Sequence, residues 1–116
     1  MTIEEFYALA GGDAADTLRR LGSEATVRRF ALRYAADGTH DALRRALAAD
    51  DRPAAFRAAH TLKGTAANLG FTALTEAAGA LTETLRAGNV PAPGEIEAVE
   101  KAQRRVVAAV AGLRDG

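Results

Sequence analysis

The 116-residue sequence predicts an all-α fold, an up-down four-helix bundle with short N-terminal helices that cover one end. Three observations support this prediction. Alanine and arginine, which favour helices, are heavily used, and β-branched residues are sparse. Apolar residues recur at the three- and four-residue spacing of helices, and no segment shows the alternation of a strand. The apolar stripes are separated by short loops, which place successive helices antiparallel.

The first two predicted helices are short. One covers residues 3–10 and ends at a pair of glycines. Asp13 can cap the other, which runs to residue 21 and stops at Gly22, because aspartate is a common N-cap and glycine a common C-cap. These are the helices expected to cover one end of the bundle.

Longer helices follow, each with a start signal, a stop signal or an apolar stripe. The first follows the N-cap Ser23 and has the apolar residues Val27, Phe30, Ala31 and Tyr34, and the second starts at Thr39 or Asp41, after the break at Asp37-Gly38. The third begins at the N-cap Asp51, has Pro53 in its first turn and runs to about Leu69. The last two run from about Thr72 to Ala87 and from about Gly94 to Leu113. The apolar repeat of the last helix has one exception, Gln103.

Composition narrows the class of protein. The 15 basic and 15 acidic residues balance, which argues against a nucleic-acid binder. No cysteine is present, and the two histidines have no convergent carboxylates, so we expect no metal site. The chain lacks an apolar run of membrane-spanning length and a signal-peptide pattern at its start. We therefore expect one domain over residues 1–116 that is cytoplasmic and monomeric, with no membrane or nucleic-acid partner.

One helix carries the candidate chemistry. On a wheel of residues 53–69, apolar side chains gather on one face, which should meet the core, and His60 lies on another face, in mid-helix. The core-facing set is Ala55, Ala59, Leu62, Ala66 and Leu69. Gly64 and Ala67 share the outward face with His60.

A single helical histidine is ordinarily a packed or solvated side chain, but the neighbours of His60 favour a functional role. Lys63 lies one turn away and is one of only two lysines among the 15 basic residues. Its flexible ammonium suits a phosphate. Gly64 costs about 1 kcal/mol relative to alanine inside a helix, so an outward glycine suggests cleared space beside His60. Arg57 adds a second positive charge at the edge of this face.

Two further side chains, Phe56 and His40, are considered for a role at the site. Phe56 lies beside His60 and is either a partly exposed anchor for a partner or a side chain folded back into the bundle. His40, at a helix start beside Asp41, is expected to be an ordinary surface residue, because none of the features around His60 surround it.

The run from His60 to Gly70, HTLKGTAANLG, closely resembles the phosphohistidine signature of histidine phosphotransfer (HPt) domains. That signature is His-x-x-Lys-Gly followed by small residues and Asn-Leu-Gly, and the helical plan extends the resemblance over most of the chain. The resemblance implies that His60 accepts a phosphoryl group, that Lys63 stabilises the phosphate and that Gly64 permits access. The opening residues 2–7 and residues 56–59 also resemble small single-domain members.

The resemblance further implies a phosphorelay carrier of two-component signal transduction rather than an enzyme. A neutral imidazole nitrogen, by resemblance Nε2, would attack an aspartyl phosphate and later donate the group to another aspartate. The expected partners are response-regulator receiver domains and a hybrid histidine kinase, contacted through Phe56, Arg57, Ala67 and Asn68 around the histidine. No cofactor is expected on this chain. Mg²⁺ is expected on the partner receiver, which would supply most of the catalysis.

Three alternatives remain at this stage. The chain could be a helical adaptor that binds receiver or kinase domains without carrying phosphate, although an intact set of His60, Lys63 and Gly64 argues against it. It could be the phosphotransfer portion of a chemotaxis-type kinase, although Met1 and the full bundle favour a free-standing protein. A metal-dependent enzyme lacks ligands.

Overall fold

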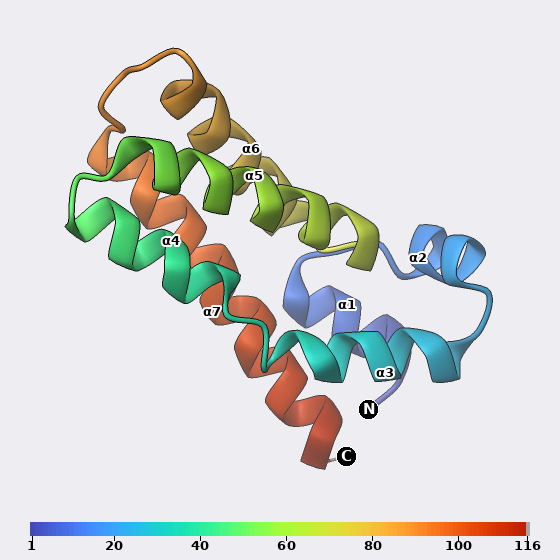
Figure 1. Cartoon of the computed structure of the whole chain (residues 1–116). Coiled ribbons are helices and arrows are strands. Elements are labelled where there is room, and N and C mark those ends of the chain that lie inside the picture. Colours follow the sequence, from blue (N-terminus) through green and yellow to red (C-terminus); the bar gives the residue numbers. More distant parts are fainter. Residues whose placement is uncertain (116) are drawn as a thin grey trace.

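A computed structural model describes residues 1–115 of the chain, and within them it contains seven helices and no strand (Figure 1). The helices are α1 (Ile3–Ala10), α2 (Ala14–Leu21), α3 (Glu24–Tyr34), α4 (Thr39–Ala48), α5 (Arg52–Leu69), α6 (Thr72–Arg86) and α7 (Pro93–Asp115). The predicted bounds agree with these to within two residues.

The helices α4 to α7 form the predicted up-down bundle (Figure 1). Each runs opposite to the one before it, and α3 leads into α4 through a bend over residues 35–38. The short helix α1 lies along the second half of α7, and α2 lies beyond the C-terminal end of α5. The all-α fold class with short covering helices is therefore confirmed.

Side-chain caps fix where several helices begin. Asp13 accepts a hydrogen bond from the Asp16 amide at 3.0 Å, Ser23 from the Thr26 amide at 3.2 Å, and Asp51 from the Ala54 amide at 3.2 Å. Each cap satisfies an amide that the first helical turn would otherwise leave without a partner. The three predicted N-caps are thus confirmed.

Gln103, the one polar residue in the apolar repeat of α7, has a hydrogen-bond partner in the core. Gln103 accepts a hydrogen bond from the hydroxyl of Tyr34, which is itself buried. Burial raises the pKa of the Tyr34 phenol, so this group remains a proton donor. The Tyr34 ring also packs against Phe71, with ring centroids 5.4 Å apart, and so joins α3 and α7 to the start of α6.

The N-terminal segment is tied to the end of α5 by hydrogen bonds. The last carbonyls of a helix have no partner within it, and here several of them accept bonds from residues far away in the sequence. The Arg20 guanidinium donates to the carbonyls of Ala67 and Asn68, at 3.2 and 2.8 Å. The Tyr7 hydroxyl donates to the Leu69 carbonyl at 2.6 Å. The end of α5 is therefore held by both α1 and α2.

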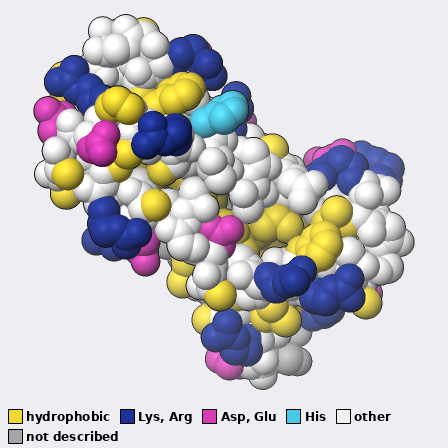
Figure 2. Space-filling model, viewed as in Figure 1, with side chains coloured by type: hydrophobic (Ala, Val, Ile, Leu, Met, Phe, Trp, Pro, Cys, Tyr) yellow, Lys and Arg dark blue, Asp and Glu magenta, His cyan; other side chains and the backbone are white. Residues whose placement is uncertain are grey.

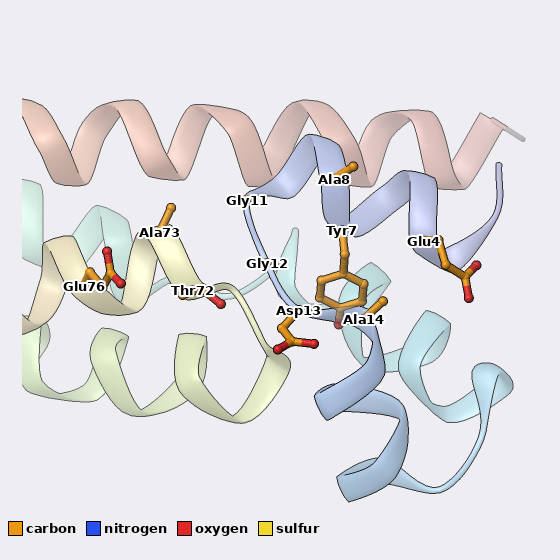
Figure 3. A pocket seen from close by; sticks show the side chains of 10 residues that line it. All are labelled: Glu4, Tyr7, Ala8, Gly11, Gly12, Asp13, Ala14, Thr72, Ala73 and Glu76. Carbon is orange, nitrogen blue, oxygen red and sulfur yellow. The ribbon is translucent and has the colours of Figure 1, made fainter.

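A backbone crossing completes this junction, which is seen from close by in Figure 3. The Asp13 amide donates to the Gly70 carbonyl, and the Ala73 amide donates to the Gly11 carbonyl, at 3.0 and 2.9 Å. The two chain segments approach so closely at Gly12 that any side chain there would overlap the Gly70 carbonyl. The glycines that end α1 and α5 therefore allow the two connections to cross.

The expectation that His40 is an ordinary surface residue is wrong. Its side chain is only 11% exposed, and its Nε2 lies 3.2 Å from Glu100 Oε1 across the space between α4 and α7. Nε2 is buried and makes no hydrogen bond that meets geometric criteria with any residue that the structure describes. The sequence shows only that His40 begins a helix. The residue that lies against His40 belongs to α7, and the sequence around His40 does not show how α7 packs against α4.

Candidate functional site

His60 lies on the exposed face of α5, near the middle of that helix. The opposite face carries the five residues predicted to meet the core, and all five are buried. Because these small and aliphatic side chains anchor α5, the orientation of His60 is fixed by the packing of the helix rather than by a mobile loop. Gly64 and Ala67 are exposed on the same side, as the wheel predicts.

An aromatic side chain and an arginine flank His60. The Phe56 ring stacks on the imidazole with centroids 5.9 Å apart and an angle of 7° between the planes. The Arg86 guanidinium, from the last turn of α6, lies 5.0 Å from the centroid of the same Phe56 ring. Figure 2 shows a histidine at the surface with hydrophobic and basic side chains beside it. Phe56 is half-buried, and so it supports the histidine ring from one side.

Lys63 is half-buried and extends across α6. A Cβ added at Gly79 of α6 would lie 3.6 and 3.7 Å from Cε and Cδ of Lys63. The aliphatic stem of the lysine therefore passes over a glycine, which leaves room for it to lie against α6 while the ammonium remains at the surface. The Lys63 side chain therefore lies against α6.

The space beside His60 is open on the side of Gly64. A Cβ at Gly64 would meet no other heavy atom within 4 Å, so the glycine is not needed for packing. Arg57, Ala67 and Asn68 are all exposed, as the predicted partner-contact residues should be. Only the backbone carbonyls of Ala67 and Asn68 are occupied, by Arg20.

Within residues 1–115, no group of three or more His, Cys, Asp or Glu side chains is arranged to hold a metal ion. The open recess in Figure 3, about 650 Å³, has Glu4, Asp13 and Glu76 along its walls, but it lies at the α1–α6 junction and not at His60. None of the described helices combines the length and the apolar character needed to cross a membrane.

Sequence reasoning missed three residues that shape this region. Arg86 and Gly79 lie on α6, and their nearness to Phe56 and Lys63 depends on the register between two helices. A signal was available at Gly79, since a glycine inside a helix is costly and implies a close approach. Arg20 reaches the end of α5 from 47 and 48 residues away, and nothing in the local sequence indicates that contact.

The comparison with protein families places most of the chain within one family model. A family model described as the Hpt domain matches residues 32–116, which include α4 to α7 and the whole of the site around His60. The matched part begins within α3, so the opening residues 2–7 lie outside it. Neither the search of curated proteins nor that of solved structures found a match.

Proposed function

The chain belongs to the Hpt domain family, and from that premise we propose that His60 is its phosphoryl acceptor in a phosphorelay. Members of this family carry phosphoryl groups in two-component systems, where they interact with receiver domains and histidine kinases, and they are carriers rather than true enzymes. The observation that carries the assignment is the position of His60: it is exposed on α5, supported by Phe56, and open on the side of Gly64.

The proposed step is a direct exchange between the imidazole and an aspartyl phosphate. A ring nitrogen of His60, Nε2 by resemblance to the family, attacks the phosphorus, and a P–N bond forms as the P–O bond to the aspartate breaks. The carboxylate leaves with the electron pair of that bond. The reverse step returns the phosphoryl group to an aspartate of a second receiver, so that this chain ends the cycle unchanged.

The residues around His60 suit the carrier role. Phosphoryl transfer depends on in-line positioning and on neutralisation of charge more than on acid–base groups. Stacking on Phe56 limits the orientations of the imidazole. Lys63, held across Gly79, provides a positive charge one turn away, and the Arg86 guanidinium provides a second one beyond Phe56. We propose that the receiver holds the Mg²⁺ and that the present chain binds no cofactor.

Transfer from phosphorylated receivers tests this function. The chain is incubated with a panel of receiver domains carrying ³²P on aspartate, and label on the chain is followed against binding of the same receivers. We expect at least one receiver to pass its label to the chain. A chain that binds receivers but never acquires label would be the helical adaptor instead.

Lys63→Ala should slow transfer or shift its equilibrium severalfold. The lysine is part exposed, so its effect on the phosphorylated state is limited to about 0.5–1 kcal/mol. Lys101→Ala is the matched control, because Lys101 is the other lysine and is exposed on α7. The measurement is the transfer rate and end point at low salt for both variants. Equal behaviour of the two would show that Lys63 is only a surface charge.

Gly64→Gln should leave the fold intact and reduce transfer at least tenfold, which equals about 1.4 kcal/mol on the barrier. The added side chain has free space within the chain and would obstruct only an approaching receiver. Gly64→Ala is the control and should raise the melting temperature by about 4 °C, because alanine is the better helix former. Thermal melts and transfer assays on the same preparations decide the matter. Transfer at the parent rate by the glutamine variant would place the docking face elsewhere.

A further inference from the structure

The helix beside α5 contains an interior glycine whose near neighbour is a lysine side chain. Gly79 lies in the middle of α6, where alanine would be the better helix former. A Cβ at Gly79 would lie 3.6 Å from Cε and 3.7 Å from Cδ of Lys63. Apart from the local backbone of α6, no other described heavy atom lies within 4 Å of that Cβ. The glycine therefore makes room for one side chain and not for the backbone of a second helix.

Two contacts define how α5 and α6 face each other around His60. The two helices lie side by side and run in opposite directions (Figure 1). Near the start of α5 the Arg86 guanidinium lies over the Phe56 ring, and farther along the Lys63 stem lies over Gly79. The contacts are about two helical turns apart on each helix, and His60 lies between them in the sequence of α5. Lys63 thus meets α6 about one turn beyond the histidine.

The Lys63 ammonium forms no ion pair with any residue that the structure describes. Two acidic residues of α6, Glu76 and Glu83, lie about one turn from Gly79, one on each side. Glu83 pairs instead with Arg86, with 3.3 Å between Oε2 and Nε. The Lys63 stem is therefore packed against α6, while its charge is not neutralised by a carboxylate and can bind a phosphate.

From this geometry we infer that Gly79 is a positioning residue for phosphoryl transfer, because it provides the place on α6 where the Lys63 stem lies. This inference rests on the proposed function. The ammonium is bonded to Cε, so contact at Cδ and Cε limits the positions that the charge can reach. A stem that is already held also loses less rotamer freedom when its ammonium binds a phosphoryl group on His60.

The size of the residue at position 79 should therefore control the contribution of Lys63. Alanine at this position would make an ordinary van der Waals contact with the lysine stem, so the stem can stay where it is. A leucine would occupy the place of the stem and displace it from α6. Since the added atoms meet only this flexible side chain, the helix itself should fold as before.

The test is a double-mutant cycle between positions 63 and 79. Its readout is the end point of ³²P exchange between the chain and a phosphorylated receiver, because obstructed docking slows the exchange without moving its equilibrium. Gly79→Leu should shift the end point toward the receiver by about two- to fivefold, as Lys63→Ala does. In the Lys63→Ala background the same leucine should cause no further shift, because the place is already vacant. Gly79→Ala should keep the end point of the unmodified chain.

Ala80→Leu is the matched control. It adds a leucine to the next position of α6, where the side chain is exposed, and should leave the end point unchanged. Nuclear Overhauser effects between the Gly79 α-protons and the Lys63 methylene protons show whether the stem lies on α6 in the unmodified chain. Thermal melts identify a variant that loses its fold, and Gly79→Val, which adds less bulk, then replaces the leucine in the cycle.

An end point for Gly79→Leu equal to that of the unmodified chain would overturn the inference. The same shift by the leucine with and without Lys63 would overturn it as well. Labelling of the unmodified chain separates these results from failure of the proposed function. If the chain is labelled and the leucine has no effect, the role of His60 stands and that of Gly79 fails. If no receiver labels the unmodified chain, the proposed function fails, and the role of Gly79 fails with it.

Discussion

His60→Gln is expected to abolish phosphorylation by receivers while leaving the helical fold intact. His60 is exposed, so glutamine at this position removes the nucleophilic nitrogen without removing a core contact. The loss should be complete, because the only other histidine, His40, is only 11% exposed and lies against Glu100 on another part of the molecule.

The measurement is transfer of ³²P from a phosphorylated receiver, with circular dichroism of the same samples. His40→Gln is the matched control and should accept label as the unmodified chain does. Label that persists in His60→Gln, or that disappears in His40→Gln, would show that the assignment of the phosphoryl group to His60 is wrong.

Gly70→Ala is expected to destabilise the protein by about 3 kcal/mol. Gly70 ends α5 with a φ of 76°, and a left-handed conformation costs an alanine about 1–2 kcal/mol. The added Cβ would also overlap Oγ1 of the buried Thr17 and crowd the Asp13 carbonyl, which adds about 1–3 kcal/mol of overpacking. The junction between the N-terminal segment and the end of α5 would have to open.

Gly22→Ala separates the two causes. Gly22 ends α2 with a φ of 89°, but a Cβ there would meet nothing within 4 Å. This variant should lose only the conformational part, about 1–2 kcal/mol. Equilibrium unfolding in urea gives both values. Equal losses in the two variants would mean that α2 yields at Thr17 and that the junction is not tightly held.

Much of the fold follows from local signals. The N-caps Asp13, Ser23 and Asp51 and the glycine stops mark the ends of helices, because capping needs only the residues of one turn. The buried face of α5 was also predicted residue by residue, since a helix anchored by small apolar side chains has a regular period. The exposed position of His60 follows from the same period.

What the sequence did not indicate depends on how helices pack against one another. The stacking of Phe56 on His60 lies within one helix, but the packing of Phe56 against the core and the position of the Arg86 guanidinium over its ring involve other helices. The cover of His40 by α7, and the contact of Lys63 with Gly79, likewise need the register of two helices. Gln103 interrupts the apolar repeat of α7, and its hydrogen-bond partner, Tyr34, lies on another helix.

The chemical nature and position of the phosphoryl bond test the central claim most directly. Chain labelled by a phosphorylated receiver is divided into samples at acid and alkaline pH, and the modified peptide is identified by mass spectrometry. Our account predicts a single phosphorylated peptide containing His60, with a bond that is labile in acid and stable in base, as expected of a phosphoramidate. A base-labile bond, or a phosphorylated peptide that lacks His60, would contradict it.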